Sequence, residues 1–353
     1  MIIPFFLMNR GCRHRCIFCN ERLLAGDRPA TITAEAFAQT VRAHLGSTPR
    51  KRGPVQIAFY GGTFTALEEG EQRRLLDLAA PFLREGLIDG IRLSTRPDEI
   101  DGPRLDLLKA AGVTTVEVGA QSLDDEVLRS ARRGHGAAET IRALCLLKER
   151  GFTRGLHLMA GLPGDDGERF RRTVEKAVSL VPDMVRLHPT VVFRDTALEA
   201  AYRAGSYAPL TIAEAIAQCA AAWKMLAAAG IPVVRIGLQT TREMEAPGAV
   251  VAGPFHPSFR SRVEAALLRE MAEALLAAAG SQEREASFIL APTHLSVFPG
   301  EGRTNIAALR ERFGLARIRL TGDPGLPPLT LLLRTGGTAL GTDATGTITP
   351  LPG

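Results

Sequence analysis

Aromatic residues are scarce in this 353-residue chain, at 5 % with a single tryptophan. Proteins that bind single-stranded nucleic acid stack bases on aromatic side chains, so this composition disfavours a stacking platform. No run of about 18 apolar residues occurs, so we expect no membrane-spanning helix. The apolar start, Met1–Met8, contains Pro4 and lacks a basic leader and a small-residue cleavage site. It therefore predicts a buried strand rather than an export signal.

Cysteine is also rare: the chain has five, and three of them lie between positions 12 and 19. Without an export signal we expect a cytoplasmic protein with reduced thiols, no membrane association and clustered cysteines that bind metal. The net charge of +5 permits an anionic partner without requiring one. Neither a G-x-G-x-x-G nor a P-loop motif occurs, which disfavours an open-sheet nucleotide-binding enzyme.

Short apolar runs alternate with helical patterns along the first 240 residues. Apolar throughout, these runs resemble strands that are covered on both faces. The predicted strands are Ile2–Met8, Val55–Phe59, Ile91–Ser94, Thr115–Val118, Gly155–Met159 and Met184–His188, with Val233–Leu238 as a further candidate. Such alternation predicts a parallel sheet, either a barrel or an open doubly wound sheet, with the active site after the strands' carboxyl ends.

We predict an α/β fold: a partial parallel (βα)6 TIM-like barrel with a small α+β C-terminal appendage. The predicted domains are a core at 1–240, the appendage at 241–334, and a flexible tail at 335–353 that is rich in glycine and threonine. Pro247, Gly248, Gly253 and Pro254 mark the linker after the core.

The densest chemical signal is the loop after the first strand, where Cys12, Cys16 and Cys19 have the spacing C-x3-C-x2-C. Thiolates are soft ligands for iron–sulfur clusters or zinc. Three thiolates can hold three corners of a cubane and leave the fourth iron open to another ligand. A structural zinc site with His14 is the alternative, although such sites usually have two separated ligand pairs.

This spacing, with an aromatic residue before the third cysteine, resembles the radical S-adenosylmethionine (SAM) superfamily. The resemblance implies that SAM ligates the open iron of a 4Fe-4S cluster. One electron then cleaves SAM, and the resulting 5′-deoxyadenosyl radical abstracts a hydrogen atom from a substrate. It also implies a reductase, flavodoxin or ferredoxin as electron donor.

Further motifs follow the later strands, and over about Met1–Gln239 they resemble the branch that contains the Elongator catalytic subunit and oxygen-independent coproporphyrinogen oxidases. The motifs are Tyr60-Gly61-Gly62-Thr63, Ser94-Thr95-Arg96, Gln121-Ser122, Arg132-Arg133-Gly134-His135 and Gly161-Leu162-Pro163-Gly164. The resemblance implies that the glycine motif binds the methionine amino group and that Gln121 and Ser122 lie near the ribose. It also implies that Arg133 approaches the SAM carboxylate.

The same resemblance places Ser94, Thr95 and Arg96 at the edge of the cofactor and Gly161 beside the adenine. His157 completes the predicted cofactor-binding set, although a histidine in an apolar strand can equally be a core residue. The coproporphyrinogen oxidases generally have aspartate at this position. The two remaining cysteines, Cys145 and Cys219, are expected to be core residues.

The catalytic residues and the substrate are not predictable from these motifs. The Elongator subunit has an acetyltransferase domain, and nothing after Gln239 resembles one, so we expect no acetyl-transfer chemistry. Three functions remain open. The first is a radical SAM enzyme of unknown substrate, the second is an Elongator-like protein that modifies the tRNA wobble uridine, and the third is a non-catalytic iron–sulfur or zinc protein that binds RNA.

Overall fold

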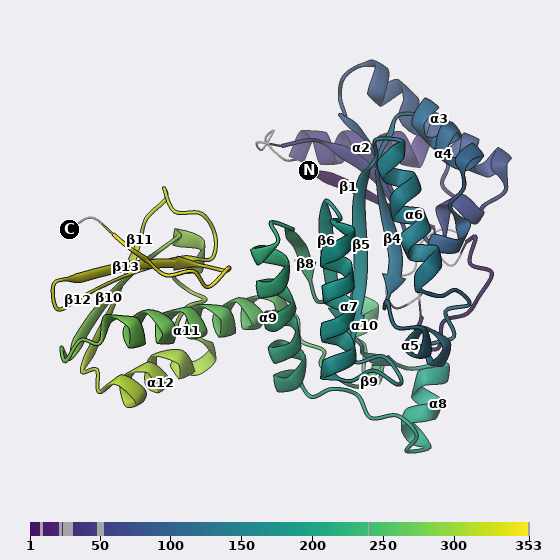
Figure 1. Cartoon of the computed structure of the whole chain (residues 1–353). Helices are drawn as coiled ribbons and strands as arrows, with labels where there is room; N and C mark the ends of the chain where they lie inside the picture. The colour runs from purple at the N-terminus through teal and green to yellow at the C-terminus, as the bar shows by residue number, and fades with distance from the viewer. Residues whose placement is uncertain (8–9, 21–22, 24–30, 48–52, 239, 352–353) are drawn as a thin grey trace. The chain divides into compact units, whose positions relative to one another are not determined.

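The computed structural model describes residues 1–7, 10–20, 23, 31–47, 53–238 and 240–351 (Figure 1). The chain forms two compact units. The first comprises Met1–Leu210 and Gln239–Phe255, and the second comprises Thr211–Leu238 and His256–Gly353. The domain limits at 240 and 334 remain predictions. In the described part of the chain, no helix is long and apolar enough to cross a membrane.

The first unit is built on parallel strands that neighbour one another in chain order. They are β1 (Ile2–Phe6), β2 (Gln56–Tyr60), β3 (Gly90–Thr95), β4 (Val113–Gln121), β5 (Thr153–Ala160) and β6 (Met184–Pro189). Short antiparallel strands β7 (Val192–Phe193) and β9 (Val250–Ala252) form a separate pair. The sheet curls into a partial barrel, which confirms the predicted α/β class and the six strand positions.

Helices, several of which cover one side of the sheet, follow the strands along the chain (Figure 1). They are α2 (Ala34–Ser47), α3 (Glu69–Arg84), α4 (Gly102–Ala110), α5 (Asp125–Ser130), α6 (Ala137–Glu149), α7 (Gly167–Leu180), α8 (Ala197–Arg203) and the short α10 (Arg242–Glu245). Asp101, Asp124 and Asp166 each accept backbone N–H groups at the start of a helix. These caps satisfy amides that have no partner within the helix, and they fix where each strand-to-helix loop ends.

Alternate residues of the strands point to opposite faces of the sheet. On the helix-covered face, Phe5 and Phe59 stack on Phe37 of α2, with ring centroids 4.2 and 6.3 Å apart. On the other face, Glu117 of β4 is the register partner of Ser94 of β3, and His157 of β5 is that of Arg186 of β6. This second face is the polar face of the sheet, and its polar side chains include Tyr60, Arg92, Ser94, Glu117, His157, Arg186 and His188.

The second unit is an α+β structure, as predicted for the appendage. Its sheet has the strand order β11-β10-β12-β13-β14, and α11 packs against β12, β13, α9 and α12. The elements are α9 (Ile212–Ala228), β8 (Val233–Ile236), α11 (Phe259–Ala279), β10 (Glu285–Leu290), α12 (Thr304–Phe313), β11 (Arg317–Gly322), β12 (Thr330–Thr335), β13 (Thr338–Asp343) and β14 (Thr349–Pro350).

The predicted flexible tail at 335–353 is wrong for most of its length. Thr338–Asp343 pairs antiparallel with β12, and Thr349–Pro350 extends the same sheet. Gly336 and Gly337, with φ of +53° and +76°, form the two-residue turn between Thr335 and Thr338. Two glycines with positive φ are what a tight hairpin turn requires, so this Gly-Gly pair signals a hairpin rather than disorder.

Candidate functional site

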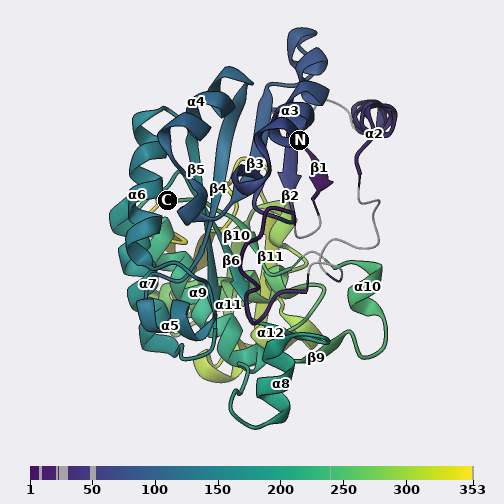
Figure 2. The ribbon, with the colours of Figure 1, turned by 90° about the vertical axis from the view of Figure 1, so that its right-hand side faces the viewer.

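The cysteine loop follows β1 and lies beyond the carboxyl ends of β1 and β2 (Figure 2). None of these three cysteines is joined in a disulfide bond in the described part of the chain; Cys12 is exposed, and Cys16 and Cys19 are partly exposed. Ile17 anchors the loop: its side chain is buried, its N–H donates to the Ala131 carbonyl, and its carbonyl accepts from the Leu198 N–H. One apolar residue therefore fixes the loop and leaves the thiols at the surface of the site.

The glycine motif after β2 holds the start of this loop by direct backbone contact. The Thr63 N–H donates to the Arg10 carbonyl at 3.0 Å, and a Cβ at Gly62 would lie 2.5 Å from that carbonyl oxygen. Reciprocally, a Cβ at Gly11 would clash with the Thr63 carbonyl oxygen. The Thr63 hydroxyl is 3.2 Å from the Cys12 Sγ. Glycine is needed at these positions because two backbone segments touch there.

Gly61 differs from Gly62 in what constrains it. Its φ is +81°, a conformation that side-chain-bearing residues rarely adopt, and an added Cβ would lie 3.3 Å from the Phe6 ring. The sharp turn at Gly61 thus ends β2 and directs Gly62 and Thr63 toward the cysteine loop.

Arg133 reaches the second cysteine from the segment after α5. Its Nη1 donates to the Cys16 Sγ at 2.8 Å, and its Nη2 donates to the Gly119 carbonyl. The structure thus places the guanidinium against the Cys16 thiol, and the role at the SAM carboxylate that the resemblance implied remains a prediction. Arg133 is 4 % exposed.

The residues at the end of β3 are mostly engaged within the protein. The Thr95 hydroxyl is 2.5 Å from the Thr65 hydroxyl, and Ser94 is partly exposed on the polar face. Arg96 binds Asp98 with two hydrogen bonds of 3.0 and 2.9 Å and also donates to the Arg133 carbonyl. Burial alone would raise the pKa of Asp98, but the hydrogen bonds and charge of Arg96 lower it overall. The placement of Ser94, Thr95 and Arg96 at the edge of the cofactor remains a prediction.

Gln121 and Ser122 form a rigid corner at the end of β4. Gln121 has a φ of +73°, which is uncommon for a residue with a side chain. The Ser122 hydroxyl is 3.2 Å from the Thr173 hydroxyl and also accepts the Asp124 N–H. Ser122 is thus used by the fold, and its assignment to the ribose remains a prediction.

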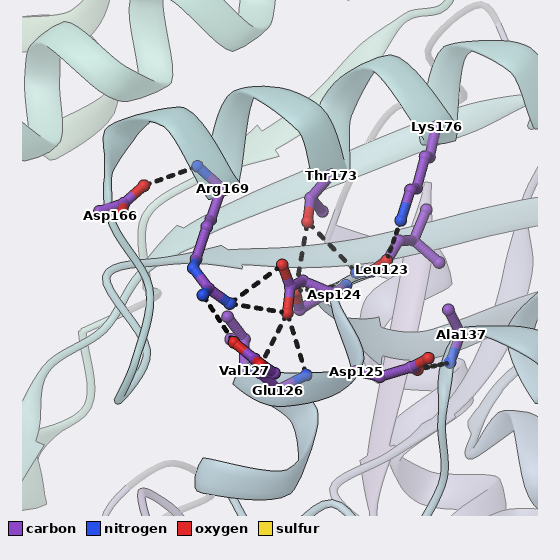
Figure 3. Close-up of polar contacts among 11 residues, drawn as sticks. Leu123, Asp124, Asp125, Glu126, Val127, Ala137, Asp166, Arg169, Thr173 and Lys176 are labelled. Atoms are coloured by element: carbon purple, nitrogen blue, oxygen red, sulfur yellow. Dashed lines mark hydrogen bonds and ion pairs between the residues drawn. The ribbon is translucent and has the colours of Figure 1, made fainter.

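The loop after this corner is held against α7 by ion pairs (Figure 3). Arg169 of α7 binds Asp124 at 3.1 Å and Glu126 at 2.6 Å, while Lys176 donates to the Leu123 carbonyl. Asp124 also caps α5, so one carboxylate fixes both the start of a helix and its contact with α7. This network fixes the loop that begins at Gln121.

Gly161, at the end of β5, is fixed through both of its backbone polar groups. Its N–H donates to Asp165 at 3.0 Å, and its carbonyl accepts the Tyr207 hydroxyl at 2.7 Å. Burial raises the pKa of Asp165 to about 7, and the nearby Asp166 and Asp124 add to the rise. Sequence reasoning did not find Asp165 or Tyr207, since neither lies in a strand or in a recognisable motif.

The polar face holds a connected set of charged side chains that sequence reasoning also missed. Glu117 binds Arg92 at 2.9 Å and Arg186 at 2.8 Å and accepts the Tyr60 hydroxyl at 2.8 Å. Burial raises the pKa of Tyr60 to about 12, with a further contribution from Glu117. The rings of His157 and His188 lie 4.3 Å apart on the same face. The sequence did carry a signal for this set, because charged residues occur within strands that are otherwise apolar.

Comparison with known proteins identifies the family. A family model described as the radical SAM superfamily matches residues 6–177, and one described as the radical SAM C-terminal domain matches residues 182–269. The chain belongs to the radical SAM superfamily. It is accordingly an enzyme whose cofactors are a 4Fe-4S cluster and SAM, as the resemblance carried by the cysteine motif implied.

Two curated relatives illustrate where this radical SAM chain lies within the superfamily. A tRNA uridine(34) acetyltransferase from Methanocaldococcus infernus is 29 % identical over 244 residues, which are 58 % of this chain and 46 % of the relative. The human Elongator complex protein 3 is 31 % identical over 192 residues, 46 % of this chain and 34 % of the relative. The chain thus spans less than half the length of these relatives.

A solved structure supports the same fold. The archaeal Methanocaldococcus infernus Elp3 with an N-terminal deletion superposes with a TM-score of 0.58 and 22 % identity, covering 76 % of this chain and 63 % of that one. This likeness confirms the partial barrel expected of a radical SAM core.

The residues present fit these cofactors. Several buried polar atoms lack a hydrogen-bond partner within the described residues, and some of them belong to the end of the sheet where the cysteine loop lies, among them Arg96 Nη1, Gln121 Oε1 and Arg133 Nε. A polar ligand would satisfy them. Within the described ranges, no three His, Cys, Asp or Glu side chains converge on a point that a single metal ion could occupy. The assignment of individual residues to cluster and SAM remains a prediction.

The raised pKa of Asp165 gives a prediction for stability. Because the folded state holds this proton up to about pH 7 while the unfolded chain releases it near about pH 4, stability should fall as pH rises between those values. Asp165→Asn keeps an oxygen for the Gly161 N–H and removes the titration. The melting temperature of the wild type, measured from pH 4 to pH 8, should therefore fall relative to that of the variant. Parallel profiles would contradict the assignment.

Proposed function

We propose that this radical SAM enzyme cleaves SAM reductively and directs the resulting radical to a substrate bound on the polar face. The observation that carries the proposal is the backbone contact between the cysteine loop and Gly62-Thr63, with Arg133 against Cys16. This contact brings the three thiols, the glycine motif and a buried cation to one end of the strands.

In this proposal, Cys12, Cys16 and Cys19 hold the cluster. When bound, the cluster supplies the electron that cleaves SAM to methionine and a 5′-deoxyadenosyl radical. The chain itself positions the cofactors and shields the reaction from solvent. Thr63 orients Cys12, and Gln121 presents a buried, unpartnered oxygen to a donor on SAM.

The substrate side of the proposal rests on the polar face. In strands β1 to β6, Glu117 is the only acidic residue of this face, and Arg92 and Arg186 both bind it. Two cations for one carboxylate favour a substrate that brings a negatively charged group. The charged groups lie on strands, where their positions are fixed more precisely than on loops.

Anaerobic turnover tests the proposed reaction. The protein reconstituted with iron and sulfide, supplied with SAM and dithionite, should release 5′-deoxyadenosine and methionine, slowly when no substrate is present. Chromatography of the products with and without dithionite gives the measurement. Intact SAM after prolonged incubation of protein that holds a full cluster would refute the proposal.

A second candidate is modification of a tRNA uridine, since several relatives are named tRNA uridine(34) acetyltransferases. A biological electron donor is required in either case. We retain the predicted cytoplasmic location as part of the proposal, because cysteines that bind a cluster need a compartment in which thiols stay reduced. We expect SAM cleavage by this chain to proceed without acetyl-coenzyme A.

We predict that tRNA binding is weak and strongly dependent on salt. The basic run 169–172 on α7 is neutralised locally: Arg169 pairs with Asp124 and Glu126, and Arg171 and Arg172 pair with Glu168. The run at 50–52 lies outside the described residues. Filter binding should show the affinity falling at least about tenfold between 50 and 200 mM salt. Tight binding that persists at the higher salt would instead make tRNA modification the leading function.

A further inference from the structure

The middle of the cysteine loop lies directly against the segment that follows α5. The Ile17 N–H donates to the Ala131 carbonyl at 3.2 Å, and a Cβ at Gly134 would lie 2.8 Å from the His14 ring. The absence of a side chain at Gly134 therefore makes room for the His14 ring. These two contacts bring the loop and the segment side by side, although they are far apart in the sequence.

Both stretches of chain expose arginine side chains where they meet. Arg13 and Arg15 are the exposed neighbours of His14 in the loop, and Arg132 is exposed on the facing segment. Arg129 is exposed in the last turn of α5, and its carbonyl accepts the Arg132 N–H at 3.0 Å. We call Arg13, Arg15, Arg129 and Arg132 the basic rim of the cysteine loop.

Most of the basic rim is free of ion pairs. Within the described residues, no carboxylate lies within ion-pair distance of Arg15, Arg129 or Arg132. Arg13 binds the buried Glu99 at 3.3 Å, yet its side chain remains 66 % exposed. Exposed cations are hydrated and need no partner inside the protein. The basic rim is therefore a solvated surface with charge of one sign.

The acidic residues of α5 do not offset this charge. Glu126 pairs with Arg169 at 2.6 Å, and Asp125 accepts the Ala137 N–H at 2.7 Å (Figure 3). Both carboxylates lie in the first turn of α5, whereas Arg129 lies in its last turn. The basic end of this helix is thus the end that leads into the contact with the cysteine loop.

We propose that the basic rim is the docking surface for an acidic electron-transfer protein. This inference rests on the proposed function, which requires an electron donor. Arg13 and Arg15 lie between Cys12 and Cys16 in the chain, so a protein bound to them is held next to the cluster. The donor is oxidised by one electron and the cluster is reduced by one, and no bond forms or breaks in this step.

Charge and composition favour a protein over nucleic acid as the occupant of the basic rim. Complementary charge raises the association rate of protein pairs by about 10- to 1000-fold, which suits a donor that has to bind and leave in every turnover. Nucleic acid without a fixed sequence is usually held by aromatic stacking as well as by basic side chains. Phe18, the aromatic residue of the loop, instead packs against an apolar cluster of the core.

Reduction of the cluster by reduced flavodoxin, the acidic probe, tests the docking surface. The reconstituted full-length protein is mixed with the probe anaerobically without SAM, and electron paramagnetic resonance follows the reduction. Arg129→Glu and Arg132→Glu should each slow the reduction at least about tenfold at low salt. The wild-type rate should fall as salt rises from about 20 to about 300 mM, and the rates of the variants should change much less.

Two controls separate docking from damage to the cluster. Reduction by dithionite, a small reagent that needs no protein interface, should change less than about twofold in the variants. Arg334→Glu makes the same change in net charge at an exposed position of β12 in the second unit, and it should leave the rate with flavodoxin unchanged.

Equal rates of reduction by flavodoxin in the wild type and both rim variants would overturn the inference, as would a wild-type rate that does not depend on salt. Weaker tRNA binding by these variants without slower reduction would also overturn it and assign the rim to RNA. If Arg132→Glu fails to hold a cluster, Arg129→Glu decides: slower reduction supports the inference, and an equal rate overturns it. SAM cleavage with dithionite is measured separately. A wild type whose cluster is reduced while SAM stays intact refutes the proposed function and leaves the docking result standing.

Discussion

Alanine at Cys12, Cys16 or Cys19 should abolish the iron–sulfur cluster and, with it, all cleavage of SAM. Each thiolate is expected to bind one iron, and all three come from a single loop, so no other cysteine can replace a missing one. The loop itself should keep its conformation, because Ile17 anchors it independently of the thiols. The expected result is a folded, colourless protein after anaerobic reconstitution.

Iron analysis and the visible absorption spectrum measure this loss. Wild-type protein should hold about four irons per chain. Cys145→Ala and Cys219→Ala are matched controls that should keep the full iron content. Cys145 is exposed on α6, which corrects its expected place in the core, whereas Cys219 is fully buried and burial raises its pKa to about 12. A cysteine-loop variant that retains four irons, or a wild type that takes up zinc instead, would contradict the assignment.

Much of the fold was predictable because local signals agreed with the global arrangement. The apolar runs became β1 to β6 within a few residues of their predicted limits, and the cysteine spacing indicated a metal site whose cofactors the family resemblance then named. Signals of this kind lie within a short stretch of chain. Where a local signal was misjudged, as at Gly336-Gly337, the error came from treating a turn as disorder.

The contacts that give the site its character were not predictable, because they join distant parts of the chain. Arg133 is 117 positions from Cys16, and Arg186 is 126 positions from Tyr60. Strand register decides which side chains of the sheet share a face, and a shift of one residue would exchange the two faces. The motif that contains Arg133 was visible in the sequence, but its contact with Cys16 was not.

The motif Gly61-Gly62-Thr63 was likewise visible in the sequence, while its contact with the cysteine loop was not. A substitution at Gly62 should therefore have a large effect on the site. By resemblance these glycines make room for methionine, whereas the structure gives Gly62 a further role in the contact with the cysteine loop. A Cβ at Gly62 would lie 2.5 Å from the Arg10 carbonyl oxygen, and backbone at that distance has to move. The Thr63–Arg10 hydrogen bond lies at the same contact and would be strained with it.

Gly62→Ala, which adds only this one carbon, should therefore displace the cysteine loop. Because a misplacement of about 1 Å can cost on the order of 100-fold in rate, we expect SAM cleavage to fall by that order, together with a reduced iron content. Gly70→Ala is the matched control: it lies in α3 with no atom within 4 Å of the added carbon, and it should leave both quantities unchanged. Iron content and 5′-deoxyadenosine formation are measured on both variants. Normal iron content with impaired cleavage in Gly62→Ala would assign the glycine to SAM alone, and normal values of both would remove it from the site.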